Sequence, residues 1–393
     1  MNPNPVEVSP MQSIPIDSTL LTFAGALDLA RTDSGFIPRR LPAWTKSQIA
    51  DVAMEAVVQL PAGVRLALTT SASTNEIDLQ LTLIRQVPRE LRPAVFDLLV
   101  DGELLAQSAT ATGNVISLGP APGEVAFEPG GPTTVSFSDL PQGTRAVEVW
   151  LPAHAAVEFR ALRINHGALI ERTGPTLPRW IHYGSSISHC VGAASPVKTW
   201  PAMVARSVGL EHTNLGFAGQ CMLDPFVART IRDSDADAIS LKVAANIIGE
   251  DAMRERPFGP ALHGFLDTIR EGKPNAPLLV VSPIFSPFSE DHPGPLFPDA
   301  DGRVVGVEGL EAIRRTSLTM RKMRATIKSV VEVRRDLGDD QLHYVSGLDL
   351  FGPADAVDLP DDLHPNDAGN ERIAERFAAV AFGPGGPLTP ALG

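Results

Sequence analysis

The sequence is poor in the residues that mark disulfide-stabilised, membrane-spanning or nucleic-acid-binding proteins. It has two cysteines, Cys190 and Cys221, in 393 residues, too few for a disulfide framework. No run approaches the roughly 18 uninterrupted apolar residues of a transmembrane helix. Lys and Arg number 33 against 46 Asp and Glu, a formal charge of −13, whereas binding to a phosphate backbone requires clustered cations. We therefore expect neither nucleic acid nor a membrane as a partner.

The first residues of the chain, MNPNPVEVSPMQS, show neither the basic start nor the apolar core of a secretory signal peptide. Unless a leader has been removed, this predicts a soluble, cytoplasmic protein with reduced cysteines. Each cysteine lies a few residues after a motif described below, so one interpretation is a redox switch or a metal pair. The other is a pair of small buried apolar side chains, which the usual burial of free cysteine favours.

The chain is long enough for two globular domains, and its first part carries a strand pattern. Alternating apolar and polar residues or β-branched runs predict strands there. These runs cover residues 57–70, 75–86, 94–109, 133–140, 145–152 and 157–165. Breaks rich in glycine and proline predict the turns between them. Many short strands without a long helix predict an antiparallel, jelly-roll-like β-sandwich over residues 1–175.

After residues 171–180, ERTGPTLPRW, short apolar runs alternate with amphipathic segments of helix length. The strands are expected at 180–184, 237–246, 276–284 and 342–351, and a strand followed by a loop at 212–219. The longer helices are expected at 199–210, 224–233, 260–272, 317–338 and 366–382. This alternation predicts an α/β domain over residues 176–393, a parallel sheet with helices on both faces. In such sheets ligands bind beyond the carboxyl ends of the strands.

One long segment, residues 286–309, interrupts this alternation and is rich in Pro, Gly and Asp. A loop of this length is often a lid or a substrate collar. A surface excursion without a role is an equally good interpretation at this point.

A candidate nucleophile follows the first strand of the second domain, in Gly184-Ser185-Ser186-Ile187-Ser188. A serine at this place lies at a helix N-terminus, where backbone N–H groups can stabilise negative charge. A simple helix cap is the alternative. Position 188 is serine, so the G-x-S-x-G elbow of α/β-hydrolases is not indicated.

A candidate base and its partner precede the last helix, in Asp361-Asp362-Leu363-His364. The Asp361 carboxylate can hold one ring nitrogen of His364 while the other faces a serine hydroxyl, which is how a serine is activated. Two further residues can supply an oxyanion hole. Gly219 lies in a glycine-containing loop after a strand and can present its backbone N–H, and Asn246 follows the next strand with a side-chain amide. Asn246 alone would more often be an ordinary turn residue.

The order of Ser186, Gly219, Asn246 and the Asp-x-x-His pair resembles the SGNH hydrolase superfamily, also called GDSL-like lipases and acylhydrolases. Its four blocks carry a nucleophilic Ser, an oxyanion Gly, an oxyanion Asn and a D-x-x-H pair. Residues 183–188, YGSSIS, look like the Y-G-S-S-I-T first block of a branch with an added N-terminal β-domain, and residues 361–366, DDLHPN, resemble D-G-L-H-P-N. The resemblance covers residues 178–382.

The resemblance implies a flavodoxin-like, three-layer α/β/α catalytic domain and assigns the roles residue by residue. Ser186 is the nucleophile, His364 the general base and Asp361 its partner, while the Ser186 N–H, Gly219 and Asn246 form the oxyanion hole. Neither a metal nor an organic cofactor is needed. The sequence departs from the family where Ser185 replaces the Asp of G-D-S, Ala244 the Gly of G-x-N, and Ile247 an Asp after Asn246.

We expect a serine esterase that cleaves a short, acetyl-like ester of a carbohydrate or small molecule through an acyl-enzyme. An acyltransferase using the same acyl-enzyme is the first alternative, and a glycan-binding protein without turnover is the second. His182 is expected to be structural. Asp233, Asp235 and Asp237 lack the Gly and Glu of a calcium loop, so a solvated connection is expected there. A homo-oligomer formed through an apolar patch on the sandwich stays open, because periodicity does not show such a patch.

Overall fold

The computed structural model describes residues 10–15, 18–49, 52–71, 74, 76–87, 92–118, 125–174, 176–306 and 314–392. The chain forms two compact units, one of Met1–Arg39 with Gln59–Pro175 and one of Arg40–Val58 with Thr176–Gly393. The sequence assigned residues 40–58 to the first domain, which is wrong for this segment. It packs with the second unit because the buried Arg40 side chain hydrogen-bonds to carbonyl groups of residues 214 and 216. Residues 1–9, 16–17, 50–51, 72–73, 75, 88–91, 119–124 and 175 of the predicted first domain lie outside the described residues.

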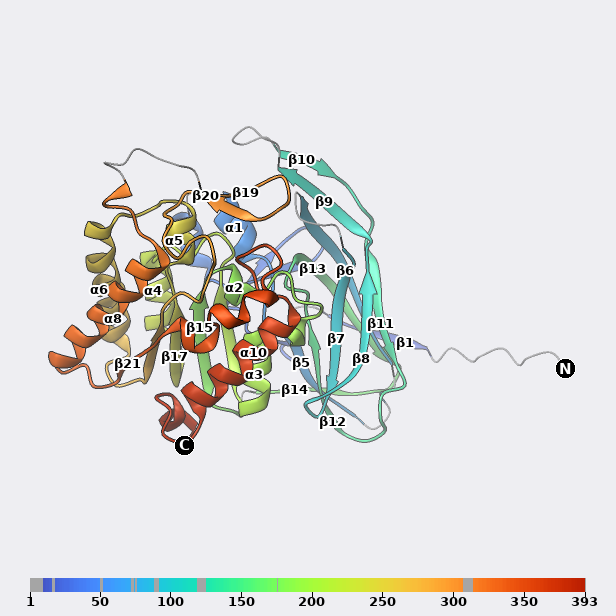
Figure 1. Cartoon of the computed structure of the whole chain (residues 1–393). Helices are drawn as coiled ribbons and strands as arrows, with labels where there is room; N and C mark the ends of the chain where they lie inside the picture. The colour runs from blue at the N-terminus through green and yellow to red at the C-terminus, as the bar shows by residue number, and fades with distance from the viewer. Residues whose placement is uncertain are drawn as a thin grey trace. The chain divides into compact units, whose positions relative to one another are not determined.

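The N-terminal unit contains two β-sheets (Figure 1). The first has the order β10 (Val125–Glu128), β9 (Gly113–Leu118), β6 (Glu76–Val87), β13 (Ala155–Asn165), β4 (Phe36–Arg39) and β3 (Asp28–Arg31), with β1 (Met11–Ile14) on β13 and β11 (Thr133–Ser138) on β6. The second has the order β14 (Ile170–Arg172), β5 (Arg65–Thr70), β12 (Arg145–Trp150), β7 (Ala94–Val100) and β8 (Glu103–Thr110), with β2 (Thr22–Ala24) on β5. Within the described residues of this unit, paired strands run antiparallel, except that β6 and β9 are parallel. The expected sandwich architecture is confirmed.

The core of this unit consists of alternate side chains from both sheets. On β6, Ile77, Leu79 and Leu81 are buried, and they belong to one cluster with Leu66 and Leu68 of β5. Burial of every second side chain is the reason that the two-residue alternation identified these strands.

The predicted strand over residues 57–70 is wrong in its first half. Val57 and Val58 end helix α1 (Val52–Val58), and the strand begins only at Arg65. Pro61 and Gly63, which has φ +75°, break the chain between the two elements.

The C-terminal unit is built on a parallel sheet with the strand order β16 (Glu211–Gly216), β15 (Arg179–Gly184), β17 (Ala238–Lys242), β18 (Leu278–Val281) and β21 (Leu342–Val345). Numbered along the chain, these strands have the flavodoxin-like order 2-1-3-4-5. Besides α1, the described α-helices of this unit are α2 (Ser186–His189), α3 (Trp200–Val208), α4 (Pro225–Arg232), α5 (Ala245–Gly249), α6 (Glu255–Gly272), α8 (Met320–Asp336), α9 (Gly347–Leu350) and α10 (Asp367–Phe377). The expected α/β fold is confirmed.

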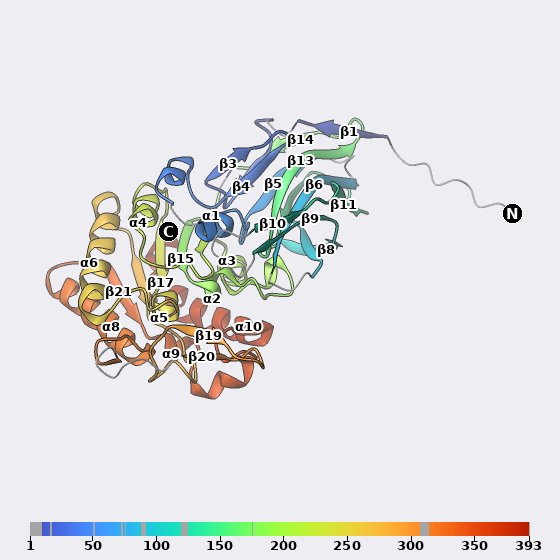
Figure 2. The same ribbon diagram turned by 90° about the horizontal axis from the view of Figure 1, so that it is seen from above.

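Helices cover both faces of this sheet (Figure 2). On β15, Trp180 packs against Trp200 of α3 and Phe377 of α10, while Tyr183 stacks on Phe265 of α6 from the opposite face. The sheet is therefore buried on both sides, which explains its apolar strand sequences. Within the described residues, no helix is both long and apolar enough to cross a membrane.

The segment that interrupts the alternation forms a short hairpin of β19 (Leu296–Pro298) and β20 (Val304–Gly306). Residues 307–309 of the predicted insertion lie outside the described residues. The hairpin is attached to the loop that carries Asp361, because the N–H of Val304 donates to the Asp361 carbonyl at 3.0 Å.

Candidate active site

Ser186 is the first residue of α2, a single helical turn that follows β15 directly. Ser185 caps this turn, its Oγ accepting from the N–H of Ile187 at 3.4 Å. The turn lies so close to the strand that a Cβ on Gly184 would be 2.2 Å from Oγ of Ser188. Glycine at 184 is therefore required for Ser186 to stand at the carboxyl end of the sheet. We find no acceptor for the Ser186 N–H within the described part of the chain.

The structure brings Ser186, His364 and Asp361 together in one hydrogen-bonded chain. Oγ of Ser186 is 2.8 Å from Nε2 of His364, and Nδ1 of His364 is 2.6 Å from Oδ2 of Asp361. A carboxylate can only accept here, so Nδ1 carries a proton and Nε2 faces the serine hydroxyl, from which it can accept. This is the arrangement in which a histidine can remove the serine proton.

The Asp361 carboxylate is held in its ionised form. Burial by itself would raise its pKa, but hydrogen bonding and Coulombic attraction from the His364 ring oppose this. Oδ1 also accepts from the backbone N–H groups of Leu363 at 3.0 Å and His364 at 2.6 Å. These interactions outweigh burial, so the pKa of Asp361 lies below its ordinary value.

Gly219 lies in a β-turn directly after β16. The N–H of Gln220 donates to the carbonyl of Phe217 at 3.0 Å, which makes Gly219 the third residue of the turn, with φ +77°. Glycine adopts this conformation without steric cost. The turn is joined to α2, because the N–H of Ala218 donates to Nδ1 of His189 at 3.3 Å.

Asn246 lies on α5 and not at the end of a strand, as the sequence suggested. Its Oδ1 accepts from the N–H of Cys221 at 3.1 Å. Because an N–H can only donate, this bond fixes the amide orientation and directs Nδ2 elsewhere. Within the residues that the structure describes, Nδ2 has no hydrogen-bond partner, so it is available to an oxyanion. The Cys221 bond also ties α5 to the segment that follows the Gly219 turn.

Two buried polar residues, Asn214 and His182, support α2 through hydrogen bonds to Ser188. Asn214 donates from Nδ2 to the Ser188 carbonyl at 3.0 Å and accepts from the Gly216 N–H at 2.7 Å. His182 has its two ring nitrogens 2.7 Å from Oγ of Ser240 and 2.8 Å from Oγ of Ser188. Burial lowers the pKa of His182 to about 3, so it is neutral at pH 7. The sequence treated His182 as structural but gave Asn214 no supporting role, although asparagine is uncommon in strands.

The other sequence candidates have structural partners. Burial raises the pKa of both cysteine thiols, Cys190 and Cys221, to about 12, so they stay protonated and behave as small buried side chains. Asp235 and Asp237 both pair with Arg179, at 3.4 and 3.3 Å. These contacts agree with the interpretation of this connection as a solvated turn.

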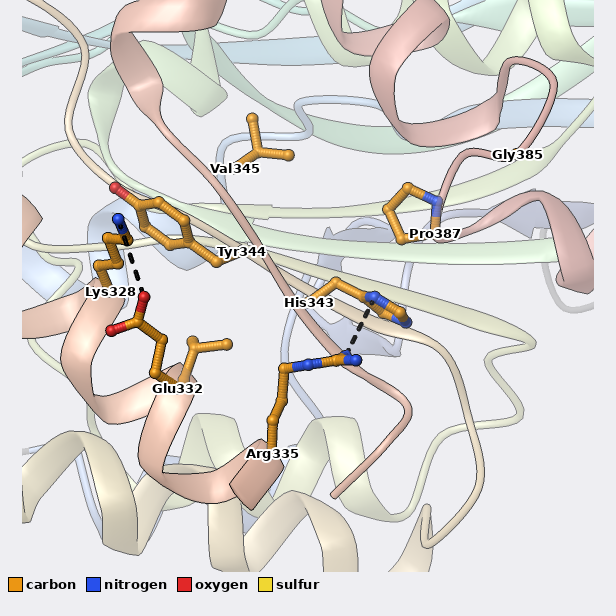
Figure 3. A pocket seen from close by; sticks show the side chains of 9 residues that line it. Lys328, Glu332, Arg335, His343, Tyr344, Val345, Gly385 and Pro387 are labelled. Carbon is orange, nitrogen blue, oxygen red and sulfur yellow. Dashed lines mark hydrogen bonds and ion pairs between the residues drawn. The ribbon is translucent and has the colours of Figure 1, made fainter. Parts of the chain in front are cut away.

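A pocket of about 390 Å³ lies away from these residues, between α8, β21 and residues 385–387 (Figure 3). Its charged side chains already interact with one another. Lys328 lies 3.7 Å from Glu332, and Nη1 of Arg335 lies 3.5 Å from Nδ1 of His343. None of the predicted site residues lines this pocket.

Comparisons with known proteins agree with the geometry. Residues 179–287 match the GDSL-like Lipase/Acylhydrolase family. The salicylyl-acyltransferase SsfX3 from a tetracycline biosynthetic pathway is 30% identical, with a TM-score of 0.77 over 93% of this chain and 95% of SsfX3. The chain belongs to the GDSL-like lipase/acylhydrolase (SGNH) family. No curated protein sequence matches it.

Two more distant structures share the fold of this SGNH protein. A GDSL-like lipase structure from Bacteroides ovatus is 19% identical, with a TM-score of 0.66 over 94% of this chain and 96% of the other. A family two carbohydrate esterase from Clostridium thermocellum, solved with cellohexaose, is 13% identical, with a TM-score of 0.55 over 82% and 92% of the two chains.

The structure explains how this SGNH site tolerates its departures from the family pattern. Ser185 caps α2 in place of the Asp of G-D-S. Ala244, in place of the Gly of G-x-N, keeps the backbone conformation that favours glycine, with φ +94° and ψ −29°. Ile247, where the family has an acid, is completely buried. The Ala244 conformation is therefore strained, whereas the other two changes fit their surroundings.

Proposed function

We propose that the protein is a serine esterase that cleaves a short-chain, acetyl-like ester of a carbohydrate or small molecule through an acyl-enzyme on Ser186. The observation that carries this proposal is the continuous chain from Ser186 Oγ through His364 to Asp361, with distances of 2.8 and 2.6 Å. The likeness to a carbohydrate esterase fold supports the substrate class.

In the first step, Nε2 of His364 takes the proton of Ser186 as Oγ attacks the ester carbonyl carbon. The ionised Asp361 stabilises the imidazolium that forms. The negative charge on the carbonyl oxygen is stabilised by the N–H groups of Ser186 and Gly219 and by Nδ2 of Asn246. His364 then protonates the leaving alkoxide oxygen as the C–O bond breaks, which releases an alcohol and leaves the acyl group on Ser186.

In the second step, water attacks the acyl-enzyme, and His364 takes its proton. The second tetrahedral intermediate uses the same oxyanion donors. Its collapse returns the proton to Ser186 and releases the carboxylic acid. The proton transfers between Ser186 and His364 pass between atoms that already lie within hydrogen-bonding distance.

An acyltransferase is the second candidate, and one observation favours it. SsfX3, which is similar over 93% of this chain, is named as a salicylyl-acyltransferase. In that case an acceptor hydroxyl or amine replaces water in the second step, with the same residues in the same roles.

The test is hydrolysis of p-nitrophenyl acetate by the wild type and by Ser186→Ala. We expect Ser186→Ala to lose several orders of magnitude in kcat while keeping the wild-type circular dichroism spectrum. Equal rates in the two proteins would exclude Ser186 as the nucleophile. Product analysis with added alcohols separates the candidates, since a transferase yields the acylated alcohol in preference to free acid.

A further inference from the structure

Arg40 is a buried cation for which the chemistry above has no role. Its side chain is completely buried, and burial lowers its pKa to about 9, which still leaves it charged at pH 7. No carboxylate among the described residues forms an ion pair with it. Taking an unpaired charge out of water is energetically unfavourable. An apolar side chain would fill the same volume without that cost, so the hydrogen bonds of Arg40 must account for its presence.

The guanidinium group joins two segments that are far apart in the sequence. Nη1 donates to the carbonyl oxygens of Asn214 at 3.0 Å and Gly216 at 2.5 Å, at the carboxyl end of β16. Nη2 donates to the carbonyl of Val57 at 2.8 Å, in the last turn of α1, where helix carbonyls lack partners within the helix. The guanidinium carbon also lies 4.9 Å from the ring centroid of Phe217, a cation–π contact.

These contacts hold Gly216 and Phe217, the two residues at which the turn that carries Gly219 leaves β16. Gly216 is the last residue of β16, and Phe217 is the first residue of the β-turn that carries Gly219. The direction of the Gly219 N–H depends on how this turn leaves the strand. A donor that is displaced by about 1 Å can lose much of its effect on a transition state.

We propose that Arg40 is a positioning residue for the oxyanion hole, which holds the end of β16 and the Phe217 ring so that the Gly219 N–H faces the developing oxyanion. This inference rests on the proposed function, because it requires that Ser186 forms tetrahedral intermediates. Lysine could not replace Arg40, since one ammonium group cannot reproduce a planar fork that bonds three carbonyls and stacks on a ring.

The test measures the rate at which a fluorophosphonate labels Ser186, alongside kcat and KM for p-nitrophenyl acetate. Labelling needs the nucleophile and the oxyanion hole but not the natural substrate. For Arg40→Lys we expect labelling and kcat to fall by about 10- to 100-fold with KM nearly unchanged. Arg39→Lys is the matched control, because Arg39 is equally buried but pairs with Asp28 at 3.3 Å. It should label within twofold of the wild-type rate.

Arg40→Met separates positioning from folding. It removes the buried charge, so the protein should remain folded while labelling still slows. Labelling of folded Arg40→Met and Arg40→Lys at the wild-type rate would overturn the proposal, and so would failure of both variants to fold, which would make Arg40 a structural residue only. An unlabelled wild type would instead count against the proposed function itself.

Discussion

Asn246→Ala removes both polar atoms of one amide, of which Oδ1 accepts from the Cys221 N–H and Nδ2 is our proposed oxyanion donor. Nδ2 is the side-chain donor available to the oxyanion, and loss of one such donor costs roughly 100- to 1,000-fold in kcat, or about 2.7–4 kcal/mol. Oδ1 accepts from the N–H of Cys221, a residue with 0% exposure. Leaving that buried donor unpaired costs about 1–3 kcal/mol of the free energy of unfolding. The variant should therefore be slower and less stable for two separate reasons.

Asn246→Asp separates the two effects. An aspartate keeps an acceptor for the Cys221 N–H. The free energy of unfolding of Asn246→Asp, measured in urea, should therefore lie closer to the wild-type value than that of Asn246→Ala does. Asn246→Asp offers no N–H and places a negative charge beside the oxyanion, so its kcat should fall at least as far as that of Asn246→Ala. KM should change little in both variants, because the donor acts on the transition state. A kcat for Asn246→Ala within threefold of the wild type would refute the oxyanion assignment.

Three further predictions follow from the geometry. Asp361→Asn should lower kcat by about 10⁴-fold, because the His364 Nδ1–H loses its charged acceptor; a loss under tenfold in steady-state assays would contradict this. Ala244→Gly should relieve the strain at φ +94°, raising stability by about 1 kcal/mol and Tm by about 2–4 °C in calorimetry, whereas an unchanged Tm would show the conformation to be unstrained. His182 has a native pKa of about 3, so its contribution to stability is present above about pH 6.5, where the unfolded histidine is also neutral, and is lost as pH falls. Between pH 6.5 and 4, the free energy of unfolding of the wild type should fall more steeply than that of His182→Gln. The difference between the two slopes should reach up to about 1.4 kcal/mol per pH unit.

Periodicity predicted the elements that are long and buried. The alternation of β6 and the helix-length repeat of α8 (Met320–Asp336) are visible because a whole face of each is apolar. The short strands β2 (Thr22–Ala24) and β19 (Leu296–Pro298) contain three residues each, too few to show a period. The pairing of β2 with β5 depends on a strand distant in the sequence, whereas β19 pairs with the nearby β20 in a hairpin.

The site residues also divide into those that the sequence could identify and those that only the structure reveals. Ser186, His364 and Asp361 stand in short motifs whose order along the chain could be recognised. The supporting role of Arg40 could not, because it depends on carbonyls 174 and 176 residues away and on the burial of a charged side chain. Arginine is almost always exposed, so a sequence pattern predicts the opposite. Asn214 precedes Gly219 by five residues, but its bond to the Ser188 carbonyl appears only in three dimensions.

The insertion at residues 286–306 contacts both sides of the site, which favours a fixed collar over a mobile lid or an idle surface loop. On one side, Oγ of Ser286 donates to the Asp362 carbonyl at 2.9 Å, and Asp362 itself adopts a left-handed conformation with φ +65°. On the other, Gly294 lies against the carbonyl of Ile248 on α5, so closely that any Cβ would be 1.7 Å from that oxygen. Opening such a lid would release the backbone that carries the acid–base pair and the helix that carries Asn246. A segment attached at these points can shape the entrance for a substrate, and its opening would break the hydrogen bonds to the carbonyls of Asp361 and Asp362.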